Sequence, residues 1–144
     1  MTEAGKTQKN LIECLSKISN ANGYHTQLQG VYPESDTVRD EARYPCALVS
    51  VVSDSINSVA SNQASRIREY GIEVVFKRGT PQEVLDQAHV DVLRALGFGK
   101  NEFERDFKGL LTDEQSAEFL PNNDGSMYTS VLITVAVAYV ETYL

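Results

Sequence analysis

Cysteine, proline and tryptophan are scarce in this sequence: its 144 residues include two cysteines, four prolines and no tryptophan. Two cysteines cannot make the framework of a small disulfide-stabilised domain, and without a CxxC pair they cannot build a metal cluster. Cys14 and Cys46 both lie in segments with periodic apolar residues. We therefore expect two buried free thiols, with a disulfide between them as the alternative.

Long hydrophobic runs and an excess of positive charge are also absent. The most apolar stretch, 131–140, is well short of the ~20 residues that a membrane helix needs, and the polar N-terminal residues lead into no signal-peptide core. The 13 basic and 20 acidic side chains give a net charge of −7, which does not attract phosphate backbones. We expect no membrane partner, and DNA only as cargo that passes the protein.

The length fits one domain, 1–144, which is large enough to bury a full core. Apolar residues spaced three and four apart predict a first helix over Thr7–Ser19. Alternating or continuous apolar segments predict strands at 24–29, 46–53, 66–77, 117–120 and 126–143. Because these strands do not alternate regularly with helices, we expect an α+β domain, with a mixed, mainly antiparallel β-sheet and two main helices packed on one of its faces.

The second of these helices is predicted over residues 81–96 by signals at both of its ends. The start and stop residues are Thr80 as N-cap, Pro81, Glu83 closing a capping box, and Gly97 as C-cap. The apolar stripe that should pack against the last strand consists of Val84, Leu85, Ala88, Val92, Leu93 and Leu96. On the other side, we expect Glu83, Asp86 and Asp91 in solvent.

Two polar segments lie between the predicted elements. Residues 31–44 mix proline with charges of both signs and show no periodicity, so we expect a long surface loop. Residues 54–65 are rich in Ser and Asn and should form the tip of an extended β-hairpin arm, mobile in the free protein and ordered on a partner. The candidate partner-contact residues of this arm are Ile56, Asn57, Val59 and Asn62.

Four further residues are candidates for partner contacts. Arg66 and Arg68 lie on one side of the strand that returns from the arm, where a pair of arginines could grip phosphates or the carboxylates of a neighbour. Phe103 and Phe107 are one turn apart in the short segment Asn101–Lys108. They either close the core of the domain or form a patch that docks on a neighbouring subunit.

Catalytic motifs are missing: the chain has no phosphate loop, dinucleotide fingerprint, nucleophile elbow or HExxH sequence. Glu83, Asp86 and His89 fall near one side of the second helix, where a metal or acid–base site could form. Charged helix surfaces are usually solvated, and that interpretation is the favoured one. We expect no catalytic, metal-binding or cofactor-binding residue and no cofactor.

The order of the segments resembles a known family. The segments that carry the resemblance are YPCALVSV at 44–51, REYGIEVVFKR at 68–78, TPQEVLDQAHVDVLRAL at 80–96 and YTSVLITVAVAYVETY at 128–143. Together they resemble the tail terminator, or tail completion, proteins of long-tailed bacteriophages, over roughly Leu11–Leu144. The stretch 98–115 is longer than the family pattern requires.

The resemblance implies a structural virion protein rather than an enzyme. It implies a ring, most simply a hexamer, that caps the head-proximal end of the tail tube, ends tube polymerisation and joins the head and neck. The implied partners are copies of the chain itself, the tail tube protein and a neck or head-completion protein. The alternatives are another neck or head-completion protein, or a small metal-dependent hydrolase or nuclease that uses Glu83, Asp86 and His89.

Overall fold

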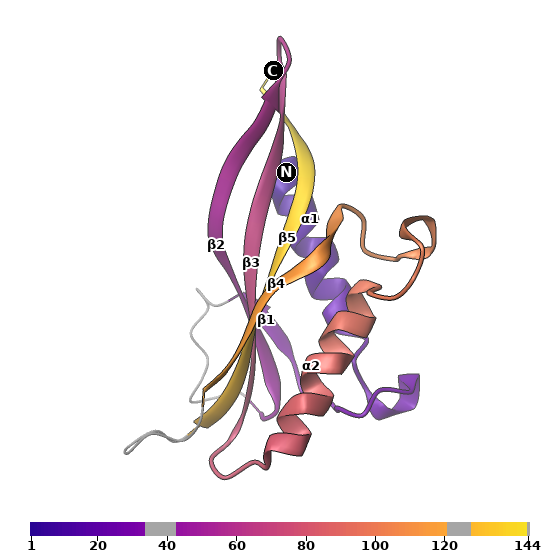
Figure 1. Ribbon diagram of the computed structural model, residues 1–144, viewed down its shortest axis with the longest axis vertical. Coiled ribbons are helices and arrows are strands. Elements are labelled where there is room, and N and C mark those ends of the chain that lie inside the picture. The colour runs from indigo at the N-terminus through magenta and orange to yellow at the C-terminus, as the bar shows by residue number, and fades with distance from the viewer. Residues whose placement is uncertain (34–42, 121–127, 144) are drawn as a thin grey trace.

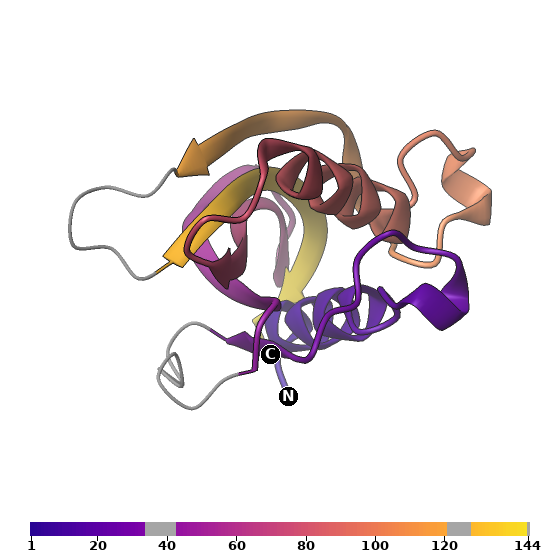
Figure 2. The same ribbon diagram turned by 90° about the horizontal axis from the view of Figure 1, so that it is seen from below.

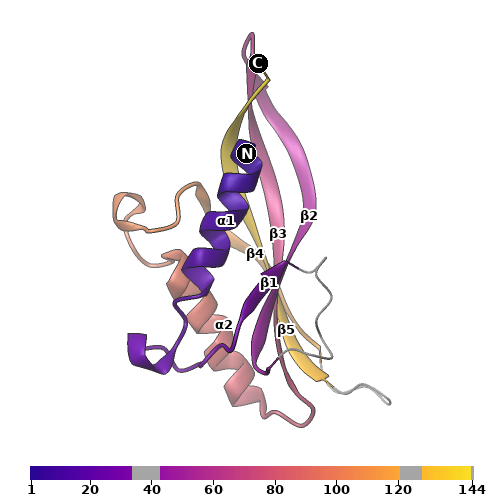
Figure 3. The same cartoon turned by 180° about the vertical axis from the view of Figure 1, so that it is seen from behind.

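The computed structural model describes residues 1–33, 43–120 and 128–143, and it confirms the predicted α+β fold. A five-stranded sheet has the order β1-β2-β3-β5-β4, in which β1 and β2 are parallel and all other neighbours are antiparallel. The main elements are α1 (Glu3–Leu15), β1 (Val31–Pro33), β2 (Cys46–Val59), β3 (Gln63–Lys77), α2 (Gln82–Leu96), β4 (Leu110–Leu120) and β5 (Tyr128–Thr142). Both helices lie on the same face of the sheet (Figures 1, 2 and 3).

The first helix begins earlier than the apolar pattern predicts. The Thr2 hydroxyl accepts a hydrogen bond from the Gly5 amide at 3.0 Å and caps the helix, which ends before Ser16 rather than at Ser19. The predicted start at Thr7 is wrong because the first turn is polar and leaves no apolar periodicity to detect. The predicted apolar stripe is buried, namely Leu11, Cys14, Leu15 and Ile18.

The strand predicted at 24–29 is wrong: a short strand forms instead at Val31–Pro33, beside β2. Residues 24–29 have no strand partner in the described part of the chain, and a side chain provides a hydrogen-bond acceptor for their backbone instead. The Thr26 amide donates to the Asp91 carboxylate at 2.7 Å. Asp91, predicted in solvent, is therefore completely buried. A buried amide needs a hydrogen-bond acceptor, and this carboxylate of α2 provides it.

The second helix confirms its predicted core face and its end at Gly97, but it begins at Gln82, one residue later than predicted, and its predicted N-cap is wrong. Its buried apolar residues are Leu85, Ala88, Val92 and Leu96, with Val84 and Leu93 partly buried. Pro81 is the N-cap and provides no side-chain hydrogen bond, while the Thr80 hydroxyl donates to the Lys77 carbonyl at 2.7 Å. Gly97 ends the helix at φ +98°, where the Arg105 side chain would lie within 2.6 Å of any Cβ.

The predicted hairpin arm is present, and it consists of strand almost to its end. β2 and β3 extend beyond the rest of the sheet, with β5 alongside them up to the pair Gln63 and Thr142 (Figure 1). The predicted polar tip at 54–65 is thus wrong in extent. β2 continues to Val59, and the turn closes where the Ala60 amide donates to the Gln63 carbonyl at 2.8 Å.

The segment that connects α2 to β4 separates the two phenylalanines predicted to share a face. A 3₁₀ turn at Glu102–Glu104 leaves Phe103 82% exposed, whereas Phe107 is 1% exposed and belongs to the core. β4 begins at Leu110, earlier than the predicted 117, and the predicted turn at 122–125 lies outside the described residues.

The two cysteines agree with the prediction of buried free thiols: Cys14 lies in the main core and Cys46 in a smaller cluster on the opposite face of the sheet. No helix among the described residues is long and apolar enough to span a bilayer. The main core lies between α1, α2 and one face of the sheet, and the arm projects beyond this core.

The contrast between buried and exposed positions of α2 gives the first testable prediction. Leu96 is completely buried, so Leu96→Ala should lower the free energy of unfolding by about 2–5 kcal/mol through lost burial and a residual cavity. Val90 lies half exposed on the same helix, and Val90→Ala should change it by no more than about 0.5 kcal/mol. Denaturant unfolding of both variants measures the difference, and equal losses would contradict this account of the core.

Candidate functional site

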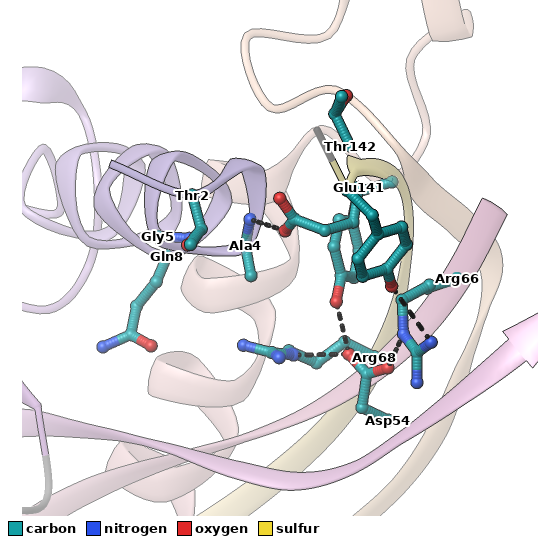
Figure 4. A pocket seen from close by; sticks show the side chains of 11 residues that line it. Thr2, Ala4, Gly5, Gln8, Asp54, Arg66, Arg68, Glu141 and Thr142 are labelled. Carbon is teal, nitrogen blue, oxygen red and sulfur yellow. Dashed lines mark hydrogen bonds and ion pairs between the residues drawn. The ribbon is translucent and has the colours of Figure 1, made fainter. Parts of the chain in front are cut away.

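A cluster of charged and phenolic side chains lies where the arm leaves the core, on the face covered by the helices. The Asp54 carboxylate accepts hydrogen bonds from Arg66 Nε and from Arg68 Nε, the latter at 2.7 Å, and a third from the Tyr139 hydroxyl at 2.6 Å (Figure 4). A second phenol, Tyr143, accepts from Arg66 Nη1 at 3.3 Å. We call Asp54, Arg66, Arg68 and Tyr139 the arm-base cluster.

A β-bulge brings Asp54 to this face of the sheet. Successive side chains of a strand point to opposite faces, and Val49 packs in the main core while Leu48 packs on the other side. An even-numbered residue of β2 would therefore point away from the helices. The register shift between Val51 and Ser53 inserts one residue, and Asp54 becomes the direct partner of Arg68.

The electrostatics of the cluster favour an ionised Asp54. Burial opposes the charge, but the hydrogen bonds from Tyr139, Arg66 and Arg68 outweigh it and lower the pKa of Asp54 to about 2. Burial and the hydrogen bond to the carboxylate raise the pKa of Tyr139 to about 12. At neutral pH the cluster thus contains one carboxylate, two guanidinium groups and a neutral phenol.

The N-terminus of α1 is tied to the same end of the sheet by Glu141 of β5. Its carboxylate accepts hydrogen bonds from the backbone amides of Glu3 at 3.1 Å and Ala4 at 3.0 Å, the second of which is drawn in Figure 4. The first amides of a helix have no partner within it, and a negative charge there interacts favourably with the helix dipole. The bond from Ala4 is the main cause that lowers the pKa of Glu141.

An open groove of about 760 Å³ lies between the arm-base cluster and the N-terminus of α1 (Figure 4). The charged side chains that line it are largely matched within the chain, Arg66 and Arg68 by Asp54, and Glu141 by the helix amides. The two arginines, predicted to grip phosphates or the carboxylates of a neighbour, bind a carboxylate of their own chain. This arrangement is suited to fixing the arm rather than to chemistry on a substrate.

Beyond the cluster, the arm exposes apolar side chains on a stretch with almost no charge. Val59 is 73% exposed and Ile56 55% exposed, and Asn57 beside them is also exposed. From Ser50 to Ser65, Asp54 is the single ionisable residue, and its charge is held by the two arginines. In a chain of net charge −7, this is a surface that another protein can approach without like-charge repulsion.

Asn62, the last candidate of the arm, has a structural contact. Its backbone carbonyl accepts from the Tyr143 amide at 2.8 Å and so joins the hairpin turn to the end of β5. Of the two phenylalanine candidates, only Phe103 is available to a partner, because Phe107 is buried in the core.

The acidic face of α2 does not gather into a catalytic arrangement. Glu83 and Asp86 are exposed, with Asp86 accepting from Gln82 Nε2 at 3.0 Å, and the His89 ring meets the Phe119 ring edge-on at 5.9 Å between centroids. Over residues 1–33, 43–120 and 128–143, no group of three His, Cys, Asp or Glu side chains is placed to hold a metal ion.

Comparison with known proteins adds no assignment, since no protein-family model matches the chain and a search of the curated proteins finds no match. Asp54, Tyr139 and Glu141 are the residues of this region that sequence reasoning missed. One signal was available for Asp54: it is the lone charge in a polar stretch that precedes two arginines on one side of a strand.

The lowered pKa of Asp54 predicts how stability depends on pH. A carboxylate whose pKa falls on folding stabilises the native state above its unfolded pKa, near 3.8, and that contribution is lost as the pH falls toward 2. We expect Asp54 to account for up to about 2 kcal/mol of stability lost between pH 4 and pH 2. Asp54→Asn should be less stable than the wild type at pH 7, and the difference should shrink across that range.

Unfolding in urea at several pH values measures this effect. Asp86→Asn, which removes an exposed carboxylate of α2, is the matched control and should follow the wild-type curve. A wild type and an Asp54→Asn variant that differ by the same amount at pH 7 and pH 2 would show that the cluster does not depend on the Asp54 charge.

Proposed function

We propose that the chain is a structural subunit of a bacteriophage tail, which assembles into a ring that caps the head-proximal end of the tail tube. The observation that carries the proposal is the arm: a three-stranded extension that is tied at its base by the arm-base cluster, carries few charges, and exposes Val52, Ile56 and Val59 among polar side chains. Exposed apolar patches on otherwise polar proteins mark interaction sites. The resemblance of the segment order to tail terminator proteins is consistent with such a protein.

In this proposal the end of the arm contacts the last ring of the tail tube protein. Ile56, Asn57 and Val59 would provide this contact, because they are exposed, Ile56 at the level of Arg66 and Val59 nearer the end of the arm. The cluster would hold the arm in a fixed direction, so that little ordering cost is added when the tube binds. Phe103, exposed on the other side of α2, would serve a second partner, such as a neighbouring subunit or a neck protein.

A neck or head-completion protein is the nearest alternative, because a ring with an apolar arm would also suit that role. The order of assembly separates the two possibilities: a terminator acts on the tube, and a head-completion protein acts on the head. A hydrolase or nuclease that uses Glu83, Asp86 and His89 has no comparable observation in its favour, since in the described part of the chain these three side chains are not placed to hold one metal ion together.

Electron microscopy of particles assembled without this protein tests the role. Unterminated tubes should grow beyond their normal length and remain without heads, and normal tails would contradict the proposal. Asp86→Ala together with His89→Ala is the control: it alters the acidic face of α2 and should restore tails of normal length. A folded double variant that fails to restore them would instead make the acidic face a contact or a reactive site.

A substitution in the arm tests the proposed contact. Val59→Asp adds a charge to the exposed end of the arm, where it should prevent capping of the tube and change the free energy of unfolding by no more than about 0.5 kcal/mol. Val90→Asp adds the same charge at a half-exposed position of α2 and should leave capping intact. Complementation of particles that lack the protein measures both variants, and normal capping by Val59→Asp would place the tube contact elsewhere.

A further inference from the structure

Neither edge of the arm has a neighbouring strand within residues 1–33, 43–120 and 128–143. On one side, β1 pairs only with Ala47–Val49, so among the described residues the outer edge of β2 has no strand partner from Ser50 to Val59. On the other side, the pairing of β4 with β5 reaches no further than Val137, and the last bond, from the Ala138 amide to the Gly109 carbonyl, is 2.8 Å. In Figure 1, β2, β3 and β5 are the strands that continue above this level, and the first turns of α1 lie beside β5.

The edge of β2 has two of the features that protect exposed strands, bulges and the inward charge of Asp54, but lacks others. Soluble proteins protect an open edge with lysine, proline, an inward charge or a bulge, because unpaired amides and carbonyls recruit other strands. Residues 50–59 contain no lysine, arginine or proline, and Asp54 points to the arm-base cluster. Two bulges interrupt the strand, but the stretch from Ser53 to Ile56 pairs regularly with β3.

The known hydrogen bonds fix which backbone groups face outward. The Ala47 amide donates outward to Gly30 and the Ala60 amide inward to Gln63. Alternation along β2, shifted at the two bulges, turns the amide of Ile56 outward and that of Ser55 toward β3. The Ala138 amide points to the outer side of β5, so that of Val140 does as well.

We propose that these two edges are the two halves of one interface between copies of this chain: the outer edge of β2, Ser50–Val59, pairs with the outer edge of β5, Tyr139–Thr142, of the next copy. The inference rests on the proposed ring and specifies how its subunits join. β2 and β5 are both antiparallel to β3 and hence run in the same direction. A neighbour rotated about an axis along the arm therefore presents its β5 edge parallel to β2.

Charge and exposure favour a second copy as the occupant. Each chain carries a net charge of −7, and the arm from Ser50 to Ser65 is where two such chains can meet with little repulsion, because its one ionisable group is already paired. The β5 edge contains one carboxylate, Glu141, which is bonded to the amides of Glu3 and Ala4. Head-to-tail pairing covers exposed apolar residues on both edges, including Val140, which is 48% exposed. Pairing of β2 with β2 would leave the β5 edge open in every copy.

Cross-linking tests this arrangement. Ser58 and Val140 both pair with Ser65 of β3, so they lie at the same level and face on the two edges, and both are exposed. Full-length Ser58→Cys and Val140→Cys proteins, mixed and treated with a short bis-maleimide, should give a product of twice the chain mass. Either variant alone, and the wild type with its buried Cys14 and Cys46, should give none.

Two proline variants distinguish loss of the interface from loss of folding. Ile56→Pro removes an outward amide and should reduce cross-linking at least tenfold with an unchanged unfolding midpoint, whereas Ser55→Pro removes an amide that faces β3 and should lower that midpoint. Self-linking by Ser58→Cys alone would show paired β2 edges and overturn the inference, as would a mixture that gives no product up to millimolar protein. Overlong tails in particles that lack the protein would still support the ring cap after such a failure.

Discussion

The Asp54 carboxylate connects the three strands of the arm, and the position of the arm depends on it. β2 contributes the carboxylate, β3 the two arginines and β5 the phenol of Tyr139. A strand pair that leaves the core has little apolar area to stabilise it, and isolated hairpins are marginally stable in water. Charge-assisted hydrogen bonds at the base of the arm, together with a third strand along the arm, provide the stabilisation that a hydrophobic core provides elsewhere in the domain.

The same cluster explains how an arm with apolar side chains remains compatible with an acidic protein. The arginines that would attract foreign anions are occupied by Asp54, and the carboxylate that would repel another acidic surface is occupied by the arginines. The arm consequently offers backbone groups and small apolar side chains rather than charge. Recognition at such a surface depends on strand geometry and shape, whereas the acidic body limits contact elsewhere.

The parts of the fold that could be predicted from the sequence are those in which neighbouring residues determine the structure. The α2 stripe, Gly97 and the alternation of β5 depend on local periodicity and conformation, and these predictions are confirmed. Contacts between distant residues were not predictable in this way. Asp91 has the pattern of a solvated residue and is buried because a loop far away in the sequence needs an acceptor for the Thr26 amide.

The same distinction between local patterns and distant contacts applies to the candidate site. Exposure of Ile56 and Val59 follows from a polar stretch with isolated apolar residues, and the structure agrees. The pairing of Arg66 and Arg68 with Asp54 depends on a bulge, which changes the face of the residues of β2 up to the second bulge and has no clear signature in the sequence. Phe103 and Phe107 were separated by a 3₁₀ turn where a regular helix would have kept them together.

The hydrogen bonds between Glu141 and the first turn of α1 affect how a force on the arm is distributed over the protein. They connect residues at opposite ends of the sequence, at the level where the arm leaves the core, and both ends of the ribbon lie near the arm in Figures 1 and 3. A force applied to the arm is therefore transmitted to α1 as well as to the sheet. The turn between β3 and α2, at the end of the molecule opposite the arm, offers a position for a label that is remote from these bonds.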